Sequence, residues 1–365
     1  MEGEAALGAQ KKDGMNYAPQ GKINHVVEPG EFNVGVTALD HGHINGMTNG
    51  LIEAGATIKY VYDPDEEKVK EYLEQFPDVE VVDSLETILE DDSIRLVAAA
   101  AIPNLRSELG NRVMRAGKDY FTDKTAFTTL EQLEETKKVV EETDQKFWVY
   151  FSERLHVEGA VYAGQLIEEG KIGDVIQVTG FGPHRLDKEK RPDWFFNREQ
   201  YGGILTDIGS HQIEQFLYYT GNEDAEILHS KIANYANPDT PDLDDYGDAT
   251  LVGENGATFF MKVHWFTPDG LPTWGDGRTF ITGTKGSIEV RKYLNLGEEN
   301  TGDHVFLVTE DGVEHHKVNG EIGFPFFGEM ILDCMNRTEN AMTQEHIFKA
   351  QELCLLAQKE AVKIK

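Results

Sequence analysis

The segment 201–214 combines the residue types and the spacing that proton transfer requires. Asp207 and His211 are four residues apart, so in a helix the two side chains lie on one face, one turn apart. An imidazole in such a pair can take a proton while the carboxylate orients it and supports its charge. The same spacing suits two zinc ligands, but no further Cys or His pair at ligand spacing completes a metal site, so we predict no metal. A helix cap beside a core histidine is the ordinary alternative.

A second candidate is Lys124, which follows the short strand pattern at 120–121. Open α/β sheets bind their ligands beyond the carboxyl ends of the strands. A lysine there can hydrogen-bond a substrate hydroxyl and lower the pKa of that hydroxyl. The ordinary alternative is a solvated lysine that pairs with Asp123.

A third candidate is the strand, turn and helix pattern at 34–54, where Ile44, Met47 and Leu51 recur at helical spacing. A helix N-terminus offers amides and a positive dipole end to a pyrophosphate. Asp63 follows the next strand, where an acidic residue can hold a ribose hydroxyl, and no arginine adjoins it, so we predict NAD rather than NADP. The turn 38–43 lacks the leading glycines of G-x-G-x-x-G. An ordinary unit in which Asp40 caps the helix is the alternative.

The elements that must position these groups change character at Phe151. Before it, strand patterns at 34–39, 57–62, 79–82, 96–101, 120–121 and 147–151 alternate with helical patterns, which predicts an α/β domain with a doubly wound parallel sheet. After it, longer β-rich runs and hairpin turns predict an α+β domain with a mostly antiparallel sheet and C-terminal helices. We therefore predict an arm at 1–33, a dinucleotide-binding domain at 34–151 and a second domain at 152–365.

Composition excludes several classes of protein. The 365 residues include 34 Lys and Arg against 65 Asp and Glu, a formal net charge of −31, which repels phosphate backbones and anionic membranes. The longest apolar run is far shorter than the roughly 20 residues that a membrane-spanning helix needs. Two cysteines make a disulfide framework improbable, and the N-terminus lacks a signal-peptide pattern. We predict a cytoplasmic protein that binds neither nucleic acid nor membrane.

These segments, in this order, resemble the Gfo/Idh/MocA family of glucose-fructose and inositol-type oxidoreductases over roughly residues 33–291. The family's T-P-N turn, E-K-P loop, E-x-R-like segment and G-G-G-x-x-x-D-x-G-x-H segment are similar to Ile102-Pro103-Asn104, Asp123-Lys124-Thr125, Glu153-Arg154 and residues 201–211. The sequence departs from the family at Asp123, Thr125 and Tyr201 and in the glycines of the phosphate loop. The turn 39–45 also resembles that of glycoside 3-dehydrogenases that begin cleavage of plant C-glucosides such as puerarin.

The resemblance implies a Rossmann domain and hydride transfer from a secondary hydroxyl of a sugar, a glycoside (at C3 of a glucoside) or a cyclitol to NAD. His211 would be the base, Asp207 its orienting partner and Lys124 the group that stabilises the alkoxide. Cofactor contacts would come from Ala38, Asp40, His41, Gly42, His43, Asp63, Ile102, Pro103, Asn104, Asp123, Lys124, Arg154 and Trp194. Substrate contacts would come from Lys124, His184, Trp194, Asp207 and His211. The second domain would also mediate assembly into a homo-oligomer.

Two other functions stay open at this point. An NAD-dependent glycosidase would oxidise C3 transiently, eliminate, hydrate and reduce back, so that no NADH accumulates. A noncatalytic NAD-binding regulator would bind the cofactor without turnover. The aromatic side chains Trp194, Trp265 and Trp274 could stack on sugar rings or belong to the core.

Overall fold

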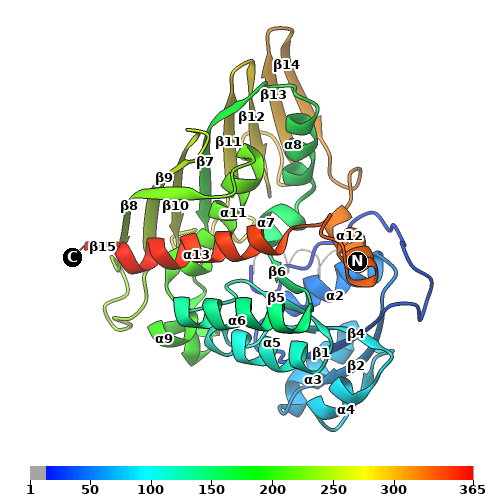
Figure 1. Ribbon diagram of the computed structural model, residues 1–365. Helices are drawn as coiled ribbons and strands as arrows, with labels where there is room; N and C mark the ends of the chain where they lie inside the picture. Colours follow the sequence, from blue (N-terminus) through cyan, green and yellow to red (C-terminus); the bar gives the residue numbers. More distant parts are fainter. Residues whose placement is uncertain (1–13, 365) are drawn as a thin grey trace. The chain divides into compact units, whose positions relative to one another are not determined.

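The computed structural model describes residues 14–364, which form two compact units (Figure 1). The first unit consists of residues 15–150 and 323–348. The second unit takes in residues 151–322 and the chain after residue 348. Residues 323–348 therefore group with the first unit although they follow the second sheet in the chain. Of the predicted arm, residues 1–13 lie outside the described part.

The first unit holds a six-stranded parallel sheet in the order β3-β2-β1-β4-β5-β6, the predicted doubly wound arrangement. Its strands are β1 (Asn33–Thr37), β2 (Thr57–Tyr62), β3 (Glu80–Val81), β4 (Ile94–Ala99), β5 (Asp119–Asp123) and β6 (Phe147–Tyr150). Its helices are α2 (His43–Glu53), α3 (Glu66–Gln75), α4 (Leu85–Glu90), α5 (Arg106–Arg115), α6 (Leu130–Thr143) and α12 (Pro325–Asn336), with the 3₁₀ turn η1 (Pro103–Leu105).

The apolar sequence of the central strands fits a parallel sheet that is covered on both faces. β4 runs from Ile94 through an alanine-rich stretch that is buried at all but one position, and such continuous apolar runs are typical of strands packed on both sides. Helix α2 ends at Glu53, and Ala54 is its C-cap residue. The next residue, Gly55, takes a φ of 101°, a left-handed conformation that glycine adopts without strain. That turn sends the chain directly into β2.

Helix α12 is one of the predicted C-terminal helices, and it packs within the first unit through two aromatic side chains. The ring of Phe326 lies 6.1 Å from that of Phe121 and 6.2 Å from that of Trp148. A Cβ on Gly50 of α2 would lie 2.2 Å from the ring of Phe327, so this glycine permits close packing of α12 on α2. Helix α13 (Gln344–Glu360) follows.

The second unit is built on a nine-stranded mixed sheet in the order β14-β13-β12-β11-β7-β10-β9-β8-β15. Its pairings are antiparallel except for β10 with β7 and β15 with β8. The strands are β7 (Val175–Pro183), β8 (Ala225–Ala233), β9 (Tyr246–Gly253), β10 (Thr258–His264), β11 (Arg278–Gly283), β12 (Gly286–Arg291), β13 (His304–Thr309), β14 (Gly312–Lys317) and β15 (Val362–Ile364). The mostly antiparallel sheet was predicted, but the β13–β14 hairpin was not.

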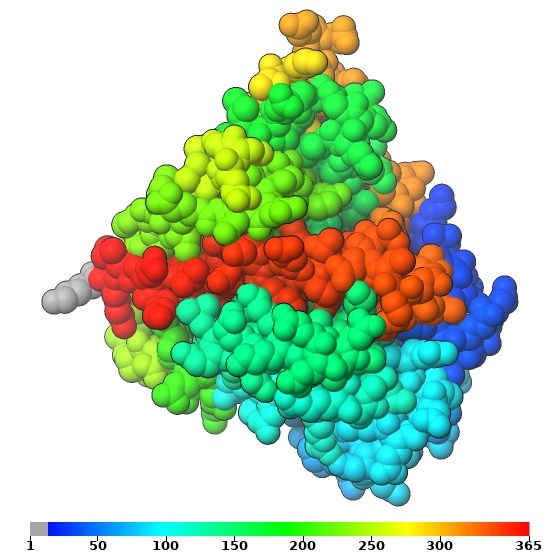
Figure 2. All heavy atoms as spheres, in the orientation of Figure 1, coloured from blue at the N-terminus to red at the C-terminus, as the bar shows by residue number. Residues whose placement is uncertain are grey.

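Short helices precede and cover this sheet. They are α7 (Ser152–Leu155), α8 (Glu158–Glu168), η2 (Lys188–Lys190), η3 (Asp193–Phe196), α9 (Arg198–Tyr201), α10 (Ile204–Asp207) and α11 (Gly209–Thr220). Helix α11 packs on β7, β9 and β10, whose inward side chains, such as Phe259 and Met261, are buried. Figure 2 shows the heavy atoms on the face that is seen in Figure 1. Within residues 14–364, no helix has both the length and the apolar character needed to cross a membrane.

Candidate active site

The loop between β1 and α2 replaces the expected glycine-rich turn with a differently supported one. Ala38 takes a φ of 53°, a left-handed conformation, at the first position of the turn where the G-x-G-x-x-G pattern would place a glycine. Helix α2 begins at His43 with Gly42 as its N-cap residue and without a side-chain cap. Asp40 instead accepts a hydrogen bond from Nζ of Lys68 at 2.7 Å. The capping alternative for Asp40 is therefore not the observed arrangement.

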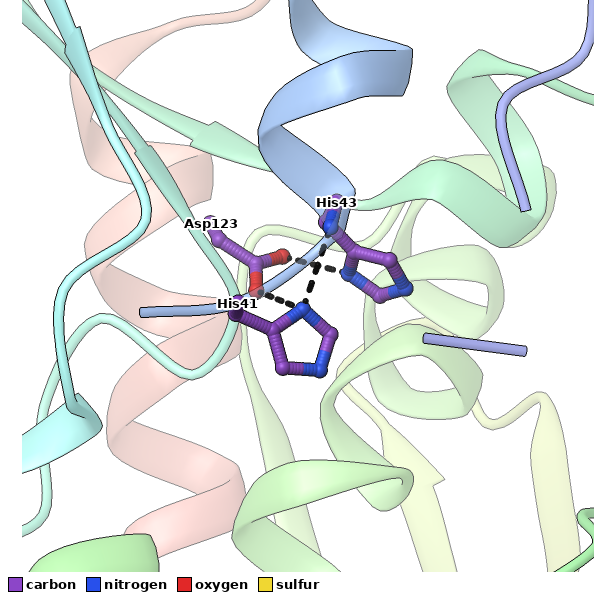
Figure 3. Close-up of side chains that lie close together, drawn as sticks. All are labelled: His41, His43 and Asp123. Atoms are coloured by element: carbon purple, nitrogen blue, oxygen red, sulfur yellow. Dashed lines mark hydrogen bonds and ion pairs between the residues drawn. The ribbon is translucent and has the colours of Figure 1, made fainter. Parts of the chain in front are cut away.

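Two imidazoles of this loop lie beside the carboxylate of Asp123 at the end of β5 (Figure 3). Nδ1 of His43 lies 2.8 Å from Oδ1 of Asp123, and Nδ1 of His41 lies 3.3 Å from Oδ2. The backbone N–H of His43 donates to Nδ1 of His41 at 3.2 Å, so a neutral His41 carries its proton on Nε2. The bond between His43 and Asp123 joins the loop to β5, and the bond from the His43 N–H to His41 supports the turn itself.

The electrostatics of this cluster follow from burial and from neighbouring charges. Burial lowers the pKa of His41 well below its usual range, and His43 lowers it further. Burial alone raises the pKa of Asp123, but the charges of His43 and Arg106 outweigh that effect and hold the pKa well below its usual range. We infer a neutral His41 beside an ionised Asp123 at neutral pH.

The donor atoms of His41, His43 and Asp123 lie within 4.8 Å of one another, close enough for metal ligands. The carboxylate already accepts from Arg106 at 3.1 Å and from the backbone N–H of Lys124 at 2.8 Å. A metal ion would also be repelled by the arginine beside the same carboxylate. We therefore describe the cluster as a hydrogen-bonded network.

Arg106, at the start of α5, organises the loop that carries Lys124. Its side chain is 1% exposed, and it donates to the carbonyl oxygens of Ala101 at 2.6 Å, of Thr125 at 3.1 Å and of Lys124, in addition to its ion pair with Asp123. Sequence analysis missed this residue, because its partners are backbone carbonyls distant in the chain. An arginine two residues after the Ile102-Pro103-Asn104 turn is the one signal that could have suggested it.

Lys124 is buried at the carboxyl end of β5, and the peptide bond that joins it to Thr125 is cis. The hydroxyl of Thr125 donates to the carbonyl of Phe127 at 3.2 Å. The solvated-lysine alternative therefore does not describe this side chain. Lys124 therefore lies at the carboxyl edge of the sheet, where open α/β sheets bind their ligands.

Asp63 follows β2 and is buried against the β1–α2 loop. Its Oδ2 accepts the backbone N–H of Leu39 at 2.7 Å, and its Oδ1 accepts that of Asp65 at 2.9 Å. A hollow of about 580 Å³ borders this carboxylate, and its lining combines apolar side chains such as Val69 and Leu73 with the charged side chains of Glu66, Lys70 and Asp83. A carboxylate can accept about four hydrogen bonds, so Asp63 retains capacity for ribose hydroxyls.

The turn Ile102-Pro103-Asn104 follows β4, beside the point between β1 and β4 where the strand order reverses. The carbonyl of Asn104 accepts from Nε2 of Gln132 at 2.8 Å, whereas its buried side-chain Oδ1 has no hydrogen-bond partner among the described residues. Ligands of doubly wound sheets bind at this reversal. An unsatisfied polar atom there is what a bound ligand would satisfy.

In the second unit, Asp207 ends α10 and His211 lies in the first turn of α11. Ile208, between the two helices, has helical dihedral angles, so the four-residue spacing places both side chains on one face. His211 is 2% exposed, and Asp207 is partly exposed. Gly203 precedes α10 and has a φ of 103°. Residues with a side chain rarely adopt this backbone conformation.

His184 and Trp194, the two other predicted substrate residues, lie in the same unit. The ring of His184 lies 4.4 Å from that of Trp274 and 5.3 Å from that of Trp265. Both tryptophans are buried, so the core alternative fits these two. Trp194 is partly exposed on η3 and touches Phe195 at a ring distance of 5.9 Å.

Arg154, a predicted cofactor residue, lies within the second unit. Its Nε lies 2.7 and 2.9 Å from the carboxylate oxygens of Glu214, and its guanidinium lies 3.9 Å from the ring centre of Tyr218. These contacts join α7 to α11. Its contact with a cofactor stays a prediction.

With this geometry in view, comparisons with known proteins define the class. Residues 34–151 match the model of an oxidoreductase family with an NAD-binding Rossmann fold. Residues 161–289 match the Gfo/Idh/MocA C-terminal domain. The chain belongs to the Gfo/Idh/MocA family of oxidoreductases, as the resemblance of its motifs implied.

Individual relatives fit this family. A crystal structure of an oxidoreductase candidate from Erwinia carotovora atroseptica is 48% identical, with a TM-score of 0.88, over 92% of this chain and 100% of that one. The scyllo-inositol 2-dehydrogenase (NADP(+)) IolW of Bacillus subtilis is 31% identical over 52% of this chain and 53% of its own. The D-xylose dehydrogenase of Paenarthrobacter nicotinovorans is 27% identical over 40% and 39%. The matched region thus spans about half or less of these two enzymes.

The residues of the first unit fit the NAD that this family model specifies. Asp63 with its adjoining hollow suits an adenosine ribose, and the unsatisfied oxygen of Asn104 lies beside the strand-order reversal. The loop 38–42 precedes the N-terminus of α2, which favours phosphate.

The buried His41 gives the protein a stability that depends on pH. Its folded-state pKa lies below about 6.5, the ordinary value, so below pH 6.5 the unfolded chain takes up a proton that the folded chain does not. As the pH decreases below 6.5, we expect this group to reduce the free energy of unfolding by up to about 1.4 kcal/mol for each pH unit. Urea unfolding at several pH values should show a shallower fall in His41→Gln. The exposed His229→Gln is the control, and identical slopes in all three proteins would contradict this assignment.

Proposed function

We propose that the protein is an NAD-dependent dehydrogenase that oxidises a secondary hydroxyl of a sugar, glycoside or cyclitol. The observation that carries this proposal is the pair Asp207 and His211 on one helical face, in a chain that also buries Lys124 at the carboxyl end of a Rossmann strand. The xylose and scyllo-inositol dehydrogenases among the relatives support a polyol substrate.

Each residue has a distinct role in this reaction. His211 accepts the hydroxyl proton, and Asp207 orients the imidazole and stabilises its charge. The Lys124 ammonium donates a hydrogen bond to the developing alkoxide and stabilises its negative charge. NAD, when bound, supplies the acceptor for the hydride.

The decisive experiment is a panel of sugars, glycosides and cyclitols with NAD, followed by NADH absorbance. Accumulating NADH is expected with at least one member. Release of aglycone without NADH would indicate the glycosidase, and tight NAD binding without turnover would indicate the regulator. Within the proposal, a glucoside oxidised at C3 is the finer candidate, because the turn 39–45 resembles that of glycoside 3-dehydrogenases. Product analysis by NMR identifies the oxidised carbon.

Cofactor choice gives a second test. A carboxylate at Asp63 accepts ribose hydroxyls but repels the 2′-phosphate of NADP. We expect Asp63→Asn to lower the preference for NAD over NADP, measured as the ratio of kcat/KM values, by about 10-fold, which corresponds to about 1.4 kcal/mol. Asp65→Asn, on the adjoining exposed turn, is the matched control. An unchanged ratio in Asp63→Asn would remove this residue from the cofactor site.

The predicted homo-oligomer and cytoplasmic location stay predictions. Sedimentation velocity of the full chain, and of a chain without residues 1–30, measures the assembly. A monomer in both would contradict the first, and an unchanged oligomer would leave the N-terminal segment without a role in it.

A further inference from the structure

The helices that carry Asp207 and His211, α10 and α11, pack on strand positions of β7 and β9 that are occupied by glycine. A Cβ on Gly180 of β7 would lie 2.3 Å from Oε1 of Gln212, and one on Gly182 would lie 3.1 Å from its Nε2. A Cβ on Gly247 of β9 would lie 2.8 Å from the side chain of Ile204. A side chain at Gly247 would press on Ile204 and Leu205 of α10, and a side chain at Gly180 would displace the amide of Gln212.

A buried ion pair binds the side chain of Gln212, the residue that follows His211 in α11. Oε2 of Glu153, from α7, accepts Nε2 of Gln212 at 2.6 Å and Nζ of Lys292 at 2.8 Å. Glu153 is 2% exposed, and Lys292, which follows β12, is 1% exposed. Buried groups of this kind are costly unless they are paired, and they lose much of their stabilisation if the geometry shifts.

A second buried contact holds the backbone of His211 itself. Nε2 of Gln215 donates to the carbonyl oxygen of His211 at 3.0 Å, and the hydroxyl of Thr279 on β11 donates to Oε1 of Gln215 at 3.2 Å. All three side chains are buried. Gln212, in the first turn of α11, is therefore held by Glu153 of α7, which Lys292 also binds. Gln215, one turn after His211, is held by Thr279 of β11.

We propose that Glu153, Lys292 and Gln212 are positioning residues for the general base, acting through the first turn of α11. This inference rests on the proposed role of His211. Apolar packing would hold the helix on the sheet but would let it slide, whereas directional hydrogen bonds to a buried carboxylate fix its register. A base displaced by about 1 Å can lose about 100-fold in rate.

The test removes the contacts without leaving a buried charge unpaired. The double variant Glu153→Met with Lys292→Met removes both partners and both charges, and Gln212→Met removes the amide while nearly conserving side-chain volume. The matched control is Lys231→Met with Asp248→Asn, an ion pair of 3.0 Å between β8 and β9. For each protein we would measure kcat, the KM for NAD, thermal unfolding and the pH titration of the His211 ring by NMR of ¹⁵N-histidine, identified with His211→Gln.

We expect kcat to fall by about 10-fold to 100-fold in both test variants, with the KM for NAD unchanged and the titration midpoint of His211 shifted. The control should keep the wild-type kcat and titration. If both test variants fold and retain the wild-type kcat and His211 titration, the inference is wrong although the proposed function stands. If the wild-type protein turns over no polyol, the proposed function fails, and the His211 titration alone decides whether these residues position the imidazole.

Discussion

His211→Ala is expected to lower kcat by about 100-fold to 10,000-fold, the range that a positioned acid–base group contributes. Without the imidazole, water must accept the hydroxyl proton, and the charge that Asp207 stabilises never forms. NAD binding should be retained, because the proposed cofactor contacts of Asp63 and Asn104 are unaffected. Stopped-flow measurement of turnover and titration of NAD by protein fluorescence separate these two effects.

The control for this prediction is His229→Ala, which removes an exposed imidazole from β8 of the same unit. It should keep the wild-type kcat. A normal turnover number in His211→Ala would defeat the assignment of the base. A loss of NAD binding together with turnover would instead point to a role for His211 in holding the cofactor.

Arg106→Met is expected to reduce the free energy of unfolding by about 3–5 kcal/mol, the usual cost of removing one partner from a buried ion pair. The change leaves Asp123 buried without its arginine and leaves the carbonyls of Ala101 and Thr125 without their donor. Because Arg106 also binds the carbonyls of Lys124 and Thr125 in the loop after β5, turnover should fall as well. Urea unfolding measures the stability.

Arg112→Met on the same helix is the matched control. Its ion pair with Glu86 is about half exposed at both side chains, and such pairs contribute between about 0 and 1 kcal/mol. A loss in Arg106→Met no larger than that in Arg112→Met would show that the buried network does not support the loop.

Local patterns were sufficient to predict the parallel sheet and the placement of Asp207 and His211 on one helical face. Alternating strand and helix patterns reflect burial on both faces of a sheet, and a four-residue spacing determines a helical face without tertiary information. Asp63 was predicted for the same reason, because it follows a strand whose bounds, Thr57–Tyr62, match the pattern.

The contacts that support the site depend on residues far apart in the chain. The bond between His43 and Asp123 joins residues 80 positions apart, and that between Lys292 and Glu153 joins residues 139 apart. Periodicity carries no information about such pairs. The hairpin of β13 and β14 was missed for a related reason: the side chains of β14 are mostly exposed, so its sequence lacks a strong apolar alternation.

The return of residues 323–348 to the first unit affects how this chain can be recombined with its relatives. A chimaera joined at residue 151 would inherit its Rossmann strands from one parent and the phenylalanines of α12, which pack on β5 and on α2, from the other. Mismatched volumes at Phe326 and Phe327 would then disturb β5, the strand that ends just before Lys124. Grafting of cofactor specificity in this family is better done with α12 transferred alongside residues 34–150.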